Sequence, residues 1–233
     1  FFFFFENRKA NPLMHLGLLR IRNVLVANLI GLVSGVIMFS LFFAVVYYTQ
    51  LPPGFGLFQT ITSSGLTLAP STLAMLLGGL IFGRVIPRIG PKPVLLMGSG
   101  FMGVGLLLFI LQRSTTWYVA GDLSVTLFGV IAIIVPIVNM LGIALPRENV
   151  AVGFGMNTLL RNLGGAIGPV VATAIMTTYT APFREGPVVA NLPTATAFNI
   201  IFGVGIVLAV LVIGISLATK NYKFENQAAQ SVT

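Results

Sequence analysis

Three cations stand within nine residues of one another in the segment Gly83-Arg84-Val85-Ile86-Pro87-Arg88-Ile89-Gly90-Pro91-Lys92-Pro93. Charge-free apolar runs of roughly twenty residues flank this segment, and a helix of that length spans the ~30 Å hydrocarbon core of a bilayer. The segment therefore predicts a tight turn between two membrane-spanning helices. Its glycines allow close approach or a positive φ, and its prolines are expected to stop the helix from continuing. Because Lys and Arg collect on the inner side of membranes, the turn is predicted to be cytoplasmic.

The composition indicates an integral membrane protein. Of 233 residues, 56% are hydrophobic and 8% are charged, whereas soluble proteins carry about 25% charged residues. The net charge of +8 does not indicate a nucleic-acid partner, because the cations border apolar runs instead of lying on a polar face with interleaved aromatic residues. With no cysteine and one histidine, neither a metal site nor a cofactor is expected.

The hydropathy pattern predicts six spans between a polar connector and a polar tail. The connector covers residues 1–23 and opens on Phe1–Phe5, which looks like the end of an earlier helix, so the sequence is expected to start within a longer protein. The tail covers residues 219–233. The spans are expected at about residues 24–48, 60–83, 93–111, 117–143, 152–179 and 196–217, within a transmembrane bundle of residues 24–218. Pro70 is expected to break the second span.

The thirteen Lys and Arg residues support this topology. If residues 83–93 lie inside, the inner segments hold ten of these cations: Arg8, Lys9, Arg20, Arg22, Arg84, Arg88, Lys92, Arg147, Lys220 and Lys223. The outer loops hold two, Arg113 and Arg184, and Arg161 lies within a span. This asymmetry predicts a multi-pass protein of the cell membrane, with both ends of the segment in the cytoplasm.

The turn at residues 83–93 resembles the loop motif of the major facilitator superfamily, roughly G-x-x-x-D-R-x-G-x-K/R. Gly83, Arg88, Gly90 and Lys92 occupy motif positions. Pro87 stands where the family usually has Asp, so an acidic contact credited to this loop cannot form. The resemblance implies that these residues form a gating loop, in which the cations brace neighbouring helix ends.

A second segment, residues 153–169, resembles the fifth helix of the C-terminal half in the fourteen-helix multidrug:proton antiporter branch of the superfamily. The connector at residues 8–13 and residues 20–23 are also similar to that branch, so the resemblance covers nearly the whole chain. It implies an all-α membrane fold, with six transmembrane helices arranged as two inverted three-helix repeats, which is half of a major-facilitator fold.

The activity that the resemblance implies is secondary active transport, as proton-coupled export of lipophilic or cationic small molecules by alternating access. The implied partners are an N-terminal transporter half, the lipid bilayer, the substrate and protons. Two alternatives stay open, a solute symporter or uniporter half and a degenerate half-transporter that serves as a structural membrane subunit. An enzyme is not expected, because the sequence shows no nucleophile–base set.

The span at residues 152–179 carries several candidate site residues. Asn157, Arg161, Gly164 and Gly168 share one helix face at i, i+4, i+7 and i+11. The glycines, Gly165 included, are interpreted as a packing surface, and Pro169 is expected to bend the helix just beyond it. An arginine within a span is costly, so Arg161 either extends to the inner surface or lies in a cavity with a charge partner. Both interpretations stay open.

The remaining candidates lie in the other spans. Asp122 is the only carboxylate within a span, either a proton-coupling group or, as we expect, a solvated residue near the outer surface. Asn28 and Asn139 are candidates because an amide facing hydrocarbon is costly. Phe39 and Phe43 suit a lipophilic substrate pocket, although phenylalanines also commonly face lipid.

Overall fold

The computed structural model describes residues 16–185 and 188–219, so the terminal segments at residues 1–15 and 220–233 lie outside the described residues. Two short 3₁₀ helices are η1 (Leu16–Arg20) and η2 (Arg147–Asn149). The long helices are α2 (Arg22–Gln50), α3 (Ile61–Ile89), α4 (Pro91–Leu111), α5 (Thr116–Ala144), α6 (Val150–Thr178) and α7 (Ala195–Leu217). In the described residues, six helices are long and apolar enough to cross a membrane, which confirms the predicted all-α membrane fold.

The turn between α3 and α4 is shorter than predicted. Helix α3 runs to Ile89, and Pro70 and Pro87 both lie inside it, so the predictions that they break or stop the helix are wrong. The break is at Gly90 alone, which has a φ of 84° and whose N–H donates to the Ile86 carbonyl. Pro91 then begins α4. At the first position of a helix the backbone N–H has no intrahelical acceptor, so a proline there loses no hydrogen bond. A single glycine with positive φ thus separates two spans.

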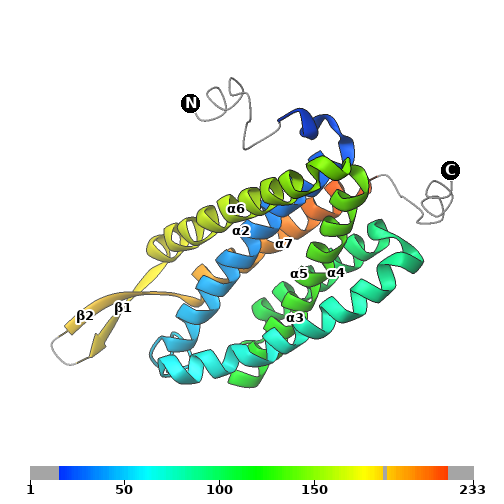
Figure 1. Cartoon of the computed structure of the whole chain (residues 1–233). Helices are drawn as coiled ribbons and strands as arrows, with labels where there is room; N and C mark the ends of the chain where they lie inside the picture. Colours follow the sequence, from blue (N-terminus) through cyan, green and yellow to red (C-terminus); the bar gives the residue numbers. More distant parts are fainter. Residues whose placement is uncertain (1–15, 186–187, 220–233) are drawn as a thin grey trace, which may run out of the picture.

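The helices pair with an internal twofold symmetry. The contact between α2 and α6 corresponds to the contact between α5 and α3. In the same way, the contact between α4 and α5 corresponds to the contact between α7 and α2. Exchanging α2, α3 and α4 for α5, α6 and α7 also maps the α2–α5 and α4–α7 contacts onto themselves. An odd number of spans in each repeat reverses the direction of the second, so the repeats are inverted, as predicted. Figure 1 shows α3 and α6 at opposite edges of the bundle, as this symmetry requires.

The edge helices bury less of their surface than the central ones. In the most apolar part of each span, 22% of residues are buried in α3 and in α6, compared with 44% in α2 and 50% in α5. Within the core, the buried ring of Phe109 of α4 stacks on that of Phe202 of α7, with ring centroids 4.9 Å apart. The open faces of α3 and α6 are therefore available to lipid or to another protein segment.

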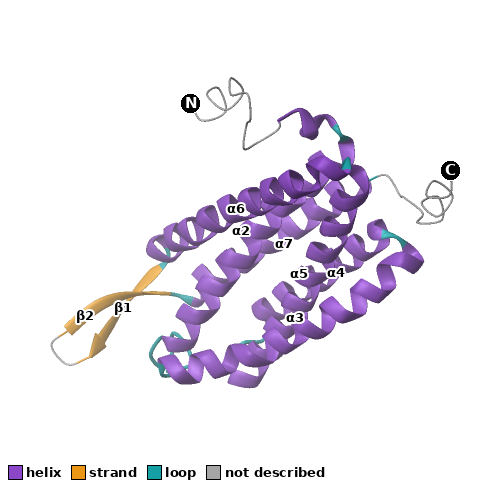
Figure 2. Ribbon diagram, viewed as in Figure 1, coloured by secondary structure: helices purple, strands orange, loops and turns teal. Residues whose placement is uncertain are grey.

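The predicted outer loop at residues 181–195 contains a β-hairpin that the sequence analysis did not predict. Strand β1 (Thr180–Glu185) pairs antiparallel with β2 (Val188–Pro193), with Thr180 opposite Pro193. Figure 2 shows the hairpin projecting beyond the ends of α6 and α7. Phe183 of β1 packs edge-on against Phe55 of the α2–α3 connection, with centroids 5.8 Å apart. The hairpin thus lies at the end of the bundle opposite the basic turn.

Candidate functional site

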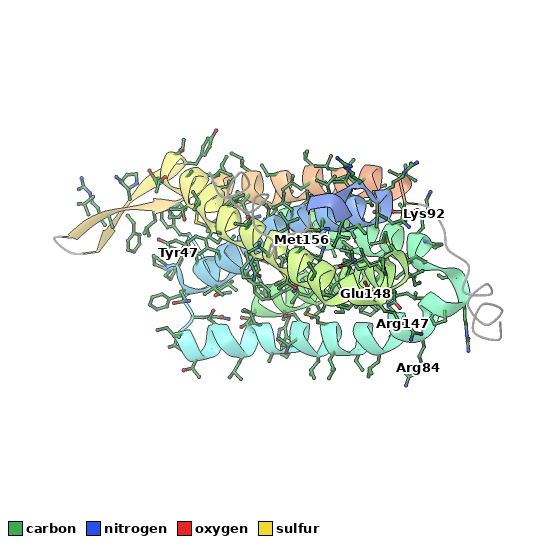
Figure 3. All side chains as sticks on the ribbon, turned by 45° about the horizontal axis from the view of Figure 1, so that its top comes forward. Tyr47, Arg84, Lys92, Arg147, Glu148 and Met156 are labelled. Atoms are coloured by element: carbon green, nitrogen blue, oxygen red, sulfur yellow. The ribbon has the colours of Figure 1, made fainter. Side chains whose placement is uncertain are left out.

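Most basic residues of the described loops and helix ends gather at one end of the bundle, whereas Arg113 and Arg184 lie at the other. Figure 3 shows Arg84, Lys92 and Arg147 at that end, with Glu148 beside them, and Tyr47 toward the other end. We call these the inner and outer ends, following the predicted topology. The residues of the loop motif lie at the inner end, where α3 and α4 meet.

The motif lysine contacts the end of another helix. Lys92 Nζ donates to the Leu217 carbonyl at 2.9 Å, and Arg22 Nε donates to the Ala218 carbonyl at 2.8 Å. These carbonyls lie at the C-terminus of α7, where the helix dipole is negative and cations are favourable. Lys92 and Arg22 therefore connect the starts of α4 and α2 to the end of α7, which stiffens the inner end of the bundle.

The motif arginine is differently placed. Arg88 is exposed in the last turn of α3, and in the part of the chain that the structure describes it makes no hydrogen bond or ion pair. Arg84, one turn earlier, reaches only the Leu80 carbonyl of its own helix, at 3.4 Å. Gly83 is exposed, and a Cβ there would meet nothing within 4 Å. Arg88 is thus available to pair with groups outside this bundle, and its gating role stays a prediction.

Backbone contacts join α2 to α6. A Cβ on Gly35 would collide with the Arg161 carbonyl, and one on Gly164 with the Leu32 carbonyl. A Cβ on Gly168 would lie 2.6 Å from the Val36 carbonyl, which is also too close. Gly165, which directly follows Gly164, lies under the Phe39 ring. Gly35, Gly164 and Gly168 thus allow the two helix backbones to touch, which is the close approach that small residues permit between membrane helices.

The three candidate asparagines lie within the helix packing. Asn157 is buried and its Nδ2 donates to the Ala27 carbonyl of α2 at 2.9 Å, so it links α6 to α2. Asn28 is buried with Nδ2 on the Val24 carbonyl at 2.8 Å, and its Oδ1 has no partner in the described residues. Asn139 is half-buried and donates to the Val135 carbonyl of its own helix. Of these amides, Asn157 makes the contact that joins two helices.

Arg161 lies deep in α6. It is eleven residues after Val150, or about 16 Å along the helix at 1.5 Å per residue. Its side chain is half-buried, and within residues 16–185 and 188–219 it makes no hydrogen bond or ion pair. This depth favours a polar cavity or a charge partner over extension to the inner surface. No carboxylate of the described residues pairs with it, so that partner would come from substrate, water or another segment.

Asp122 is buried, so the expectation of a solvated carboxylate is wrong. Its side chain is 3% exposed, and Oδ2 has no hydrogen-bond partner among the described residues. Gln112, just after α4, lies within hydrogen-bonding reach of the carboxyl. The burial arises because α4 packs closely along this face of α5, where Gly105 leaves no room for a Cβ beside Thr126. The position of Asp122 in the sequence could not reveal that α4 covers its side chain.

Phe39 and Phe43 lie on one exposed stripe of α2, and each is 36% exposed. The stripe continues to Tyr47, whose ring stacks on Phe43 with centroids 6.2 Å apart. A hollow of about 500 Å³ is lined by Phe43, Tyr47 and their neighbours Phe42, Val46, Gln50, Leu51 and Pro52. Tyr47 is not among the predicted site residues, although its i+4 spacing from Phe43 indicates a shared helix face. An aromatic hollow of this kind suits an apolar ligand.

Arg113 joins three helices at the outer end, a role that the sequence analysis did not predict. Its guanidinium donates to Asn199 Oδ1 at 2.6 Å, to the Phe109 carbonyl at 2.8 Å and to the Ala195 carbonyl at 3.0 Å. Tyr48 Oη donates to the Arg113 carbonyl at 3.0 Å, and the cation lies over the Tyr48 ring. Arg113 therefore holds together the outer ends of α2, α4 and α7.

These features can be compared with known proteins. The family model described as Major Facilitator Superfamily matches residues 5–169. This chain belongs to the Major Facilitator Superfamily. Its six apolar helices and inverted repeats correspond to half of the superfamily fold, and the protein is a multi-pass membrane protein.

Two curated relatives from bacteria are named for multidrug transport or resistance. Multidrug transporter protein MdtP of Bacillus subtilis (strain 168) is 25% identical over 177 residues, which cover 75% of this chain and 32% of that protein. Multidrug resistance protein Stp of Mycobacterium tuberculosis (strain H37Rv) is 24% identical over 186 residues, which cover 79% of this chain and 34% of that protein. The chain thus spans about a third of the length of these superfamily relatives.

A solved structure supports the same fold. The peptide transporter POT (E310Q mutant), in a crystal structure with sulfate, has a TM-score of 0.66 and 15% sequence identity. The match covers 84% of this chain and 37% of that chain. At this identity the likeness shows the superfamily fold alone.

Proposed function

We propose that this chain is the C-terminal half of a secondary active transporter that exports lipophilic or cationic small molecules in exchange for protons. The observation that carries the proposal is the inverted-repeat bundle of a superfamily member, which is the architecture of alternating access. The names of the multidrug relatives support the substrate class. The aromatic hollow beside Phe43 and Tyr47 is consistent with an apolar substrate.

In this proposal the bundle moves as one body against an N-terminal half, on the same polypeptide or on a separate chain. Rigid-body motion is supported by the backbone contacts between α2 and α6. It is also supported by the hydrogen bonds from Lys92 and Arg22 to the C-terminal end of α7. Rocking would then alternately separate the exposed faces of α3 and α6 from the partner half and bring them back against it. No cofactor is required by this mechanism.

Dye export from cells tests the proposal against its alternatives. Cells that express the full-length protein should retain less of a lipophilic cationic dye than control cells, and a protonophore should remove the difference. Dye accumulation instead of export would favour a symporter or uniporter. Unchanged dye content, with the protein at the membrane, would favour the degenerate half-transporter.

The proposed orientation in the cell membrane makes a labelling prediction. Pro53 is exposed in the α2–α3 connection, and Pro146 is exposed between α5 and η2. In a background without other reactive thiols, the Pro53→Cys variant should react with an impermeant thiol reagent applied outside intact cells. The Pro146→Cys variant should react only after permeabilisation. The reverse pattern would contradict the assigned inner and outer ends.

The proposed gating role of Arg88 makes a second prediction. Arg88→Ala should lower the initial transport rate by about fivefold or more, a typical coupling between conformational states, without lowering membrane insertion. The matched control is Arg84→Ala, which removes an exposed arginine one turn away that is not a motif residue. If the two variants transport equally well at equal expression, the motif arginine has no specific gating function.

A further inference from the structure

Asp122 is a buried carboxyl close to the outer end of the bundle. It lies six residues after Thr116, or about 9 Å along α5. Its side chain is 3% exposed, and Oδ2 is buried without a partner among the described residues. Lipid or a second transporter half around this bundle can only reduce the exposure further. A short path therefore separates a buried acid from the outer aqueous phase.

Among the residues that the structure describes, no cation compensates a charge on Asp122. The elements packed against α5 are α2, α3, α4 and α6. The charged or titratable side chains that these elements and α5 place near the outer end are Tyr47, Tyr48, Arg113, Tyr118 and Tyr179. The guanidinium of Arg113 is engaged by Asn199, Phe109 and Ala195, and the part of α3 at this end carries no charge. In the described part of the chain, the neutral Gln112 side chain is close enough to hydrogen-bond to the carboxyl.

An ionised carboxylate does not suit this position. Burying an unpaired charge is far more costly than burying a neutral carboxyl, and an unsatisfied oxygen adds to that cost. The acid form, which carries no charge, is compatible with the close packing of Gly105 beside Thr126. The ionised form needs water at Oδ2, so the outer ends of α4 and α5 must separate to admit it.

We propose that Asp122 is a proton-binding site whose occupancy is linked to the packing of the outer ends of α4 and α5. The carboxyl takes a proton from the outer aqueous phase when these ends pack together, and releases it to the same phase when they separate. The proposal rests on the proposed function, and it assigns to this half of the transporter a group through which external protons bias the conformational equilibrium.

A buried thiol beside Asp122 tests this linkage in the full-length protein. Val119 is fully buried, and it lies on the same face of α5 as Asp122 and Thr126, at i, i+3 and i+7. The Val119→Cys variant would be labelled by an impermeant thiol reagent at a series of external pH values. Because thiolate content itself rises with pH, each rate is divided by that of Ser114→Cys, which is exposed in the α4–α5 connection.

The labelling ratio should rise with external pH by about fivefold or more, within the usual range of coupling between ligand and conformation. In the Asp122→Asn background, where the side chain keeps its shape but cannot ionise, the ratio should stay low at every pH. Asp122→Glu should keep the pH dependence. Glu148→Gln is the matched control, since it converts an exposed acid at the inner end into its amide, and it should behave like the parent.

Two results would overturn the proposal. One is a labelling ratio that does not change with pH when Asp122 is present, and the other is a pH dependence that persists in Asp122→Asn. Labelling needs no transport, so this test is independent of the proposed function. A protein that shows the pH-dependent ratio but exports no dye would keep the proton site and contradict the export proposal.

Discussion

Gly164→Val is expected to lower the free energy of unfolding by about 3 kcal/mol or more, the upper part of the range for overpacking. The reason is that the new Cβ would collide with the Leu32 carbonyl and approach the backbone nitrogen of Val36. Backbone atoms in a helix cannot rotate away as side chains do, so α2 and α6 must separate. Thermal unfolding of the purified full-length protein in detergent measures the loss, together with its monodisperse fraction.

Gly155→Val is the matched control for this prediction. Gly155 is in the same helix, and a Cβ there would meet nothing within 4 Å. Both substitutions replace a helical glycine with the same residue, so intrinsic helix propensity cancels between them. Equal stability of the two variants would show that the contact between α2 and α6 does not depend on Gly164.

Arg161→Met is expected to abolish transport while the protein still inserts and folds. Methionine removes a charge that is costly within a membrane, so insertion should become easier. The guanidinium would be lost from a half-buried position about 16 Å into α6, where the described residues provide no partner for it. Arg161→Lys should transport more slowly than the parent, because it keeps the charge but loses the planar fork that pairs two oxygens at once.

Transport measured at matched surface expression separates a functional arginine from one that only extends to the membrane surface. Arg147→Met is the control, because Arg147 is an exposed cation at the inner end. If Arg161 acts in transport, only its own variants lose activity. Parent-like transport by Arg161→Met would refute the functional claim for this residue.

The spans were predictable because hydrophobic length and the position of cations are local properties of the sequence. Gly90 was predictable for the same reason, since a glycine between basic residues and two apolar runs indicates a break. The expectation that Pro87 stops the helix was wrong, because a proline near the end of a helix need not stop it. Its missing N–H removes one hydrogen bond, and the helix continues for two more residues to Ile89.

The site was less predictable, because burial depends on which helix covers a residue. Asp122 reads as an interfacial acid from its position in the chain, yet the close approach of α4 buries it. Arg113 reads as a loop cation, yet its partner Asn199 is 86 residues away. Asn157 read as a substrate candidate, whereas its amide joins α6 to Ala27 of α2. Each of these contacts forms only once distant helices have packed.

Proton-driven transport by the purified full-length protein in liposomes tests the central claim most directly. Liposomes with an acidic lumen would be mixed with a lipophilic cationic dye, and dye uptake would be recorded together with the luminal pH. We expect the dye to accumulate against its gradient while protons leave the lumen, and a protonophore to abolish accumulation. Dye movement that only equalises its concentration, or that is unchanged when the pH gradient is removed, would contradict proton-coupled export.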